Sequence, residues 1–228
     1  MTVCEKLFVN MGHIKTFYKF MNESVSKDVV LDIMKVAKGI DYETFLRKTD
    51  SLHQNILYRG MVQGDVLQDM CFMTDYIGHA KTYGDGDVDG IVCNDDEILR
   101  FNDKTFNNMR RDMRSVNKVQ IHKIYVPYFK AYKLFDVMEG EFEEESGVIN
   151  FVHSFMRSDI PYSKVQKDKI KNDLLIPIMQ HYASTKGKNI IMFAGGDYAD
   201  YGGADEFVVN DVGRYQTLKN IWNKANKK

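Results

Sequence analysis

The sequence predicts an α+β fold, because strand-like and helix-like segments occupy different parts of the chain. Short apolar runs, bounded by glycine or polar residues, predict strands at 56–59, 70–73, 89–93, 189–193 and 206–209. Apolar residues at helical spacing predict helices at 27–37, 102–113, 148–156, 168–182 and 214–222. We therefore expect a single domain over 1–228, with a helical N-terminal part at 1–55, a β-rich core at 56–101 and 187–221, and a mainly helical insertion at 102–186.

Capping signals support the first helices. Ser24 or Ser26 is suited to cap the helix at 27–37, and Gly39 follows its last turn. Asp41 is suited to cap a second helix that begins at Tyr42. These two helices are expected to pack behind the first strand.

Two of the three prolines in the insertion affect its predicted helices, and one predicted helix has a basic face. Pro127 predicts a strand or turn before a helix that begins at Tyr128, and Pro177 predicts a kink or a break. Asn102 or Asp103 can cap the helix that carries Arg110, Arg111 and Arg114. Those arginines are interpreted as a solvated surface, with a groove for an acidic partner as the alternative.

Composition excludes several classes of protein. The 228 residues are 44% apolar and 28% charged, as in ordinary globular proteins, and a net charge of −1 gives no support for a nucleic-acid footprint over the whole chain. Three cysteines without a Cys-x-x-Cys pair indicate a reducing compartment and argue against a zinc knuckle. Because no apolar run approaches the ~18 residues of a membrane span and no secretory signal is visible, a cytoplasmic location without a membrane partner is expected.

The stretch 56–90 is the part of the chain whose residues suggest chemistry. An apolar run leads to Arg59 and Gly60, and a second leads to Thr74. A short helix with Tyr76 and Tyr83 follows, so that two strand ends and one helix would bring these side chains together. In the alternative interpretation, Arg59 is a surface ion-pair partner and the tyrosines are core residues.

Three motifs in this stretch resemble a known family. In order they are Tyr58-Arg59-Gly60, Phe72-Met73-Thr74-Asp75 and Ala80-Lys81-Thr82-Tyr83-Gly84, and a late strand at 204–211 carries Glu206. This order resembles an ADP-ribosyltransferase-like domain, in the divergent form found in bacteriophage and toxin proteins. The resemblance covers 56–101 and 187–221, and it implies a split β-sheet core.

The resemblance also implies an activity and roles for particular residues. The protein would transfer ADP-ribose from NAD to a protein or nucleic-acid acceptor, or hydrolyse NAD, as a phage or bacterial effector in the host cytoplasm. Glu206 would be catalytic with Thr74 in support, because a carboxylate stabilises the positive charge that develops on the ribose. The residues expected to bind the cofactor are Arg59, for the pyrophosphate, together with Tyr58, Gly60, Tyr76 and Tyr83. A glycine-rich loop at 195–203 is expected to move over the acceptor.

Some positions depart from the family pattern. Ala204 stands where arginine-modifying members have a second acidic residue, which disfavours arginine as the target. Met73 and Asp75 flank Thr74 where the family has a hydroxyl–x–hydroxyl motif. A non-enzymatic phage or bacterial interaction protein on the same scaffold is therefore the alternative function.

A second pattern overlaps the same stretch. The acidic residues and the glycine at 85–96 have the spacing of a calcium-binding loop, with Asp85, Asp87 and Asp89 at the first three ligand positions. Asp96 stands where such loops have a glutamate, and no second loop is present to pair with it. Calcium is therefore the less favoured cofactor, and no metal ligand is assigned.

Overall fold

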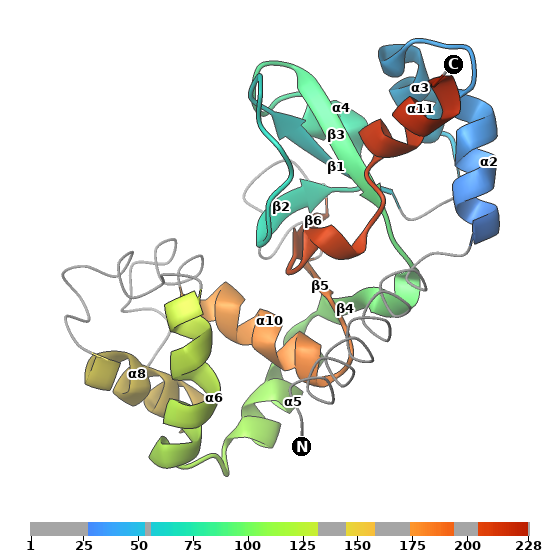
Figure 1. The fold of residues 1–228 in the computed structure, drawn as a ribbon. Helices are drawn as coiled ribbons and strands as arrows, with labels where there is room; N and C mark the ends of the chain where they lie inside the picture. Colours follow the sequence, from blue (N-terminus) through green and yellow to red (C-terminus); the bar gives the residue numbers. More distant parts are fainter. Residues whose placement is uncertain (1–26, 53–55, 132–144, 158–173, 194–204, 228) are drawn as a thin grey trace, which may run out of the picture. The chain divides into compact units, whose positions relative to one another are not determined.

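The computed structural model describes residues 27–52, 56–131, 145–157, 174–193 and 205–227. Within them the protein is α+β, with eight α-helices and a six-stranded sheet (Figure 1). The chain forms two compact units, one from Met1–Leu99 and Met192–Lys228, the other from Arg100–Ile191. The proposed caps Ser24 and Ser26 and the loop predicted at 195–203 lie outside the described residues.

The sheet order is β3-β1-β2-β6-β5-β4. β1 (Ile56–Met61) pairs antiparallel with β3 (Asp87–Val92) along its whole length, and β2 (Cys71–Thr74) pairs antiparallel with β6 (Glu206–Val209). β1 meets β2 at the pair Tyr58 and Thr74, also antiparallel. β4 (Ile98–Phe101) and β5 (Ile190–Phe193) complete the sheet, and the boundary between the two units falls within these two strands.

Four helices belong to the first unit. They are α2 (Lys27–Ala37), α3 (Tyr42–Thr49), α4 (Ile77–Ala80) and α11 (Leu218–Asn226), with two short 3₁₀ turns, η1 (Asp95–Glu97) and η4 (Val212–Arg214). The predicted helix at 27–37 is confirmed, and Asp41 caps α3 by accepting a hydrogen bond from the Thr44 amide at 2.8 Å. The helix predicted at 214–222 begins later, because Thr217 is its cap and accepts from the Asn220 amide at 3.1 Å.

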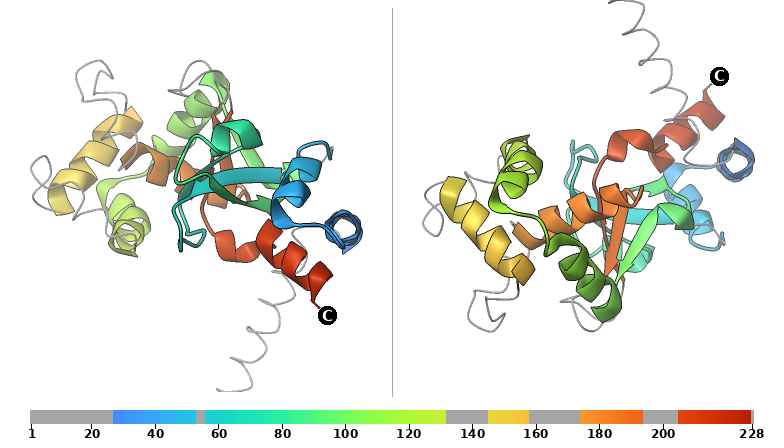
Figure 2. Two further views of the ribbon diagram at one scale, coloured as in Figure 1. Left: turned by 90° about the horizontal axis from the view of Figure 1, so that it is seen from above. Right: turned by 90° about the horizontal axis from the view of Figure 1, so that it is seen from below.

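One face of the sheet packs on α2, α3 and α11, which lie side by side in all views (Figures 1 and 2). The buried side chains of this core are Ile33, Ala37, Phe45, Leu46, Ile56, Tyr58, Ile77, Ala80, Val88, Val92, Leu218 and Ile221. α11 docks on the turn between α2 and α3 through its last residues. The Asn226 side chain donates to the Ala37 carbonyl at 2.9 Å and accepts from the Gly39 amide at 2.8 Å.

Asp89 links three elements of this unit. Its Oδ1 atom accepts hydrogen bonds from the Tyr42 hydroxyl of α3 at 3.0 Å, from the Lys219 amide of α11 at 3.1 Å and from the Gly90 amide at 2.8 Å. Burial raises the pKa of Asp89, while the two amides and the tyrosine hydroxyl oppose that rise. One carboxylate therefore ties α3 and the start of α11 to β3.

Gly60 allows α4 to lie close against β1. A Cβ atom at this position would collide with the backbone carbonyl oxygens of Ala80 and Tyr83, at the end of α4. The backbone of the two elements approaches so closely that only glycine fits, which explains the residue after Arg59 without reference to a ligand.

The second unit contains α5 (Asp103–Met113), α6 (Lys118–Ala131), α8 (Glu145–Arg157) and α10 (Ile176–Thr185). The predicted cap of α5 is confirmed, since Asn102 accepts from the Thr105 amide at 3.0 Å. Pro177 lies in the first turn of α10, where a proline is tolerated.

The prediction that Pro127 precedes a helix was wrong, because Pro127 lies inside α6. A proline at this position leaves the carbonyl of Lys123 without its helical partner. Both residues are exposed, so that water can satisfy this carbonyl. The start of α6 is secured by a reciprocal pair, in which Asn117 and Gln120 each accept from the other's amide at 3.0 Å.

Replacing Gly60 by alanine should destabilise the first unit, because the new methyl group must displace backbone atoms. We expect the Gly60→Ala variant to lose about 1–3 kcal/mol of unfolding free energy in urea denaturation. Gly213→Ala is the matched control, since its new Cβ would meet a side-chain oxygen of Asp211 at 3.3 Å. Equal losses in both variants would contradict the close approach of α4.

The contribution of Asp89 to stability should depend on pH. Burial raises the folded-state pKa of Asp89 above the unfolded value of about 3.9, so the folded protein binds the carboxyl proton more tightly than the unfolded chain does. The stability that comes from this tighter proton binding is present at low pH and is lost as pH rises through the folded-state pKa. As pH rises from below the unfolded pKa of about 3.9, the unfolding free energy of wild type should therefore fall relative to that of Asp89→Asn. Urea denaturation at a series of pH values measures it, with Asp65→Asn, at an exposed position, as the control. A pH-independent difference would contradict the burial of this carboxylate.

Candidate functional site

The strongest candidate site lies where β2 ends and β6 begins. Thr74, the last residue of β2, is the direct cross-strand partner of Glu206, the first residue of β6. Direct partners in an antiparallel pair project from the same face, with Cβ atoms about 5 Å apart. The structure therefore brings together the two residues that sequence analysis assigned to catalysis.

Thr74 and Glu206 differ in how accessible they are. Thr74 is 4% exposed, and its Oγ1 atom accepts from the Tyr76 amide at 3.3 Å. It thereby supports the turn from β2 into α4. Glu206 is only partly buried, so it is the more accessible residue of the pair.

Two further acidic residues flank this pair. Asp75 follows Thr74, and Asp205 precedes Glu206. Burial raises the pKa of Asp75, and the negative charge of Asp205 raises it further. The β2–β6 corner, which we define as Thr74, Asp75, Asp205 and Glu206, therefore concentrates negative charge and favours a group that gains positive charge.

Arg59 does not join this corner. It pairs with Asp89 across β1 and β3, whereas its neighbour Tyr58 pairs with Thr74. Since successive side chains of a strand point to opposite faces, Arg59 projects away from the face that carries Thr74 and Glu206. The register contradicts the expectation that Arg59 and Glu206 face one shared hollow.

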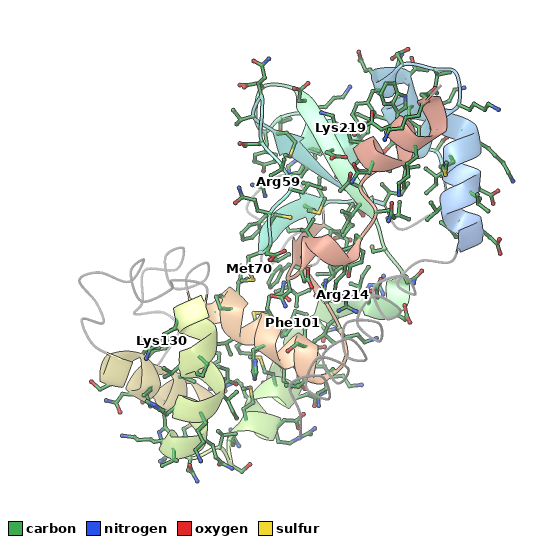
Figure 3. All side chains as sticks on the ribbon, viewed as in Figure 1. Arg59, Met70, Phe101, Lys130, Arg214 and Lys219 are labelled. Carbon is green, nitrogen blue, oxygen red and sulfur yellow. The ribbon has the colours of Figure 1, made fainter. Side chains whose placement is uncertain are left out.

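The guanidinium of Arg59 instead contacts β2. Its NH1 atom donates to the Phe72 carbonyl oxygen at 2.9 Å, and Figure 3 shows Arg59 beside these two strands. The recorded pairing of β1 with β2 is a single residue pair at Tyr58 and Thr74. The side chain of Arg59 therefore adds a hydrogen bond between β1 and β2 beside their short backbone pairing, and it helps to hold these two strands together.

The neighbours of Arg59 are also part of the fold. Tyr58 is 1% exposed, and its hydroxyl donates to Thr49 Oγ1 at 3.2 Å. Burial raises its pKa to about 12. Tyr58 was expected to bind the cofactor, but it is a core residue that a cofactor cannot reach, and Gly60 is required by the packing of α4.

The aromatic residues of the α4 region are accessible. Tyr76 is 57% exposed and Tyr83 is 44% exposed. The Tyr83 hydroxyl lies 3.3 Å from His79 Nε2, and the two rings meet edge to face with centroids 5.1 Å apart. Because the end of α4 packs over Gly60, which shares its face with Tyr58 and Thr74, α4 lies on the same side of the sheet as Glu206.

The structure gives no support to the alternative of a calcium loop at 85–96. Asp87 and Asp89 lie in β3, which is extended and paired with β1 residue by residue. Asp96 follows in η1, so the carboxylates are spread along the strand rather than gathered around one point. The described residues contain no group of three or more side chains that could hold a metal ion.

Sequence analysis missed a basic pocket in the second unit. The described residues that line it are Arg114, Ser115, Val116, Asn117, His153 and Arg157. One available signal was the spacing of His153 and Arg157, four residues apart and therefore on one face of a helix. The other was the cluster of Arg110, Arg111 and Arg114, which was interpreted as a solvated surface, with a groove for an acidic partner as the alternative.

None of the described helices is both long enough and apolar enough to cross a membrane. Comparison of the chain with protein-family models, with curated proteins and with solved structures found no significant match.

Proposed function

We propose that this protein cleaves the bond between nicotinamide and ribose in NAD, and transfers ADP-ribose to a protein or nucleic-acid acceptor or to water. The observation that carries this proposal is the cross-strand pairing of Thr74 with Glu206 on the face that α4 partly covers. The order of motifs that resembles an ADP-ribosyltransferase-like domain supports it. A split β-sheet core of that kind is part of the same proposal.

The acidic corner suits this reaction. As nicotinamide leaves, positive charge develops on the ribose, and a nearby carboxylate stabilises it more strongly in the transition state than in bound NAD. Glu206 is partly exposed and lies directly opposite Thr74, and Asp75 and Asp205 add to the negative potential. Tyr76 and Tyr83 are exposed aromatic rings on which nicotinamide can stack.

Thr74 and Arg59 act as positioning residues in this proposal. Thr74 is buried and supports the backbone that leads to Tyr76. Arg59 holds the Phe72 carbonyl, two residues before Thr74. The pyrophosphate contact first assigned to Arg59 is replaced by this structural role, because its side chain leaves from the other face of the sheet.

An exposed apolar surface favours a second function. Val62, Val66, Phe72, Tyr76 and Tyr83 are large hydrophobic residues of β2, α4 and the neighbouring loops that are between 38% and 71% exposed. Where such residues adjoin one another, they are typical of surfaces that bind another protein. A non-enzymatic interaction protein on this scaffold is therefore the second candidate.

The Glu206→Gln variant tests the catalytic role. We expect nicotinamide release from NAD by the full chain to fall by about 10²–10³-fold, because glutamine keeps the shape of the side chain but removes the charge. Glu43→Gln on α3, where the carboxylate side chain is 72% exposed, is the matched control and should keep full activity. Chromatography of nicotinamide and transfer of labelled ADP-ribose to lysate proteins and nucleic acids are the measurements.

Activity of Glu206→Gln equal to that of wild type would remove Glu206 from catalysis. If wild type itself releases no nicotinamide and labels nothing, the transferase proposal fails and the interaction protein is the better interpretation.

The Arg59→Gln variant separates a structural role from a cofactor contact. If Arg59 only holds β2, KM for NAD should stay within about threefold of wild type, while kcat and the unfolding free energy fall, the latter by about 1 kcal/mol. Arg47→Gln on α3 is the control for loss of a surface charge. A tenfold or larger rise in KM with unchanged kcat would restore the cofactor contact.

A further inference from the structure

The second unit contains a basic pocket of about 440 Å³. Its walls are the turn between α5 and α6, which contains Arg114 and Asn117, and the end of α8, which contains His153 and Arg157. α6 and α8 lie side by side in Figure 1. The pocket is a shallow hollow, because four of its described lining residues, Arg114, Ser115, Asn117 and Arg157, are exposed.

The turn that forms one wall is held in place by its own hydrogen bonds. The Arg114 amide donates to the Arg111 carbonyl at 3.3 Å, and the Val116 amide donates to the Met113 carbonyl at 3.1 Å. Asn117 is committed to the cap of α6 through Gln120. The local geometry is therefore set without a ligand.

The second wall is attached to the first by packing. Lys118 at the start of α6 donates to Asn150 Oδ1 of α8 at 2.8 Å. The rings of Phe106 in α5 and Phe155 in α8 meet edge to face at 5.8 Å, and the Arg110 guanidinium lies 5.8 and 5.9 Å from their centroids. These contacts hold the helices that present Arg114 and Arg157.

The lining of the pocket is cationic. Arg114 and Arg157 provide planar guanidinium groups, and His153 provides ring nitrogens. The described lining residues include no acidic side chain. Guanidinium forks match the oxygens of a phosphoryl group in geometry and in charge, and Val116 adds an apolar surface beside them.

We propose that this pocket binds a phosphorylated small molecule through its phosphoryl group. Arg114 and Arg157 hold the phosphoryl oxygens, and His153 is a third donor at the same site. The positive charge of the described lining favours an anionic ligand over a neutral one, and the volume of the pocket exceeds that of a phosphate ion, which leaves room for an organic group. This site is independent of the proposed NAD chemistry at Glu206.

Isothermal titration of the full chain tests the proposal. The probes are inorganic phosphate, adenosine monophosphate and adenosine, each at the same ionic strength set with chloride. We expect both phosphate-bearing probes to bind and adenosine not to bind. Tighter binding of the nucleotide than of phosphate indicates an organic phosphate as the natural ligand, and equal binding indicates the free ion.

Variants locate the binding. Arg114→Gln and Arg157→Gln should each weaken phosphate binding at least about tenfold, because each removes charge-assisted hydrogen bonds. Arg157→Lys keeps the charge but loses the planar fork and should weaken binding less. Arg111→Gln is the matched control, since Arg111 is exposed on the same helix, lies 3.8 Å from Asp112 and does not line the pocket. Melting temperatures of all variants verify that they fold.

Three outcomes would overturn the proposal. They are no phosphate binding at millimolar concentration, binding of adenosine as tight as that of its monophosphate, and the same loss in Arg111→Gln as in Arg114→Gln. Glu206→Gln should leave phosphate binding unchanged, so failure here and failure of the NAD proposal are distinguishable.

Discussion

The register of the antiparallel strands in the first unit is the constraint on which the candidate site depends. The pairs Tyr58–Thr74 and Thr74–Glu206 form one row across β1, β2 and β6, so their side chains share a face. The neighbouring pairs, Arg59–Asp89 and Met73–Phe207, point to the other face. Because side chains alternate along a strand, a shift of one residue in either pairing would exchange these rows. The composition of the acidic corner is therefore a consequence of backbone pairing.

That same face contributes to the core at one end and carries the proposed site at the other. Near β3 it is covered by α2, α3 and α11, where Tyr58 is buried. Near β6 it carries Glu206, which is only partly buried. Residues of the Tyr58-Arg59-Gly60 motif thus explain the stability of the strand and the approach of α4. The residues proposed for catalysis lie at the far end of the row.

The two units differ in the charge that they concentrate. The corner of the first unit gathers carboxylates of Asp75, Asp205 and Glu206, which favour a developing cation. The pocket of the second unit gathers the guanidinium groups of Arg114 and Arg157, which favour an anion. A net charge of −1 for the whole chain conceals this segregation, because opposite local charges cancel in the sum.

The sequence by itself determined the helix at 27–37, the caps Asp41 and Asn102, and the existence of the strands in the β-rich segments, because these signals act within one or two turns of the backbone. The tertiary structure decided the rest. Pairing with β1 drew Asp87 and Asp89 into a strand and removed the calcium loop, and it turned Arg59 away from Glu206. Water-exposed surface around Pro127 allowed a helix to continue through a proline. Each of these outcomes depends on partners distant in the chain or on solvent, and neither is visible in the local pattern of residues.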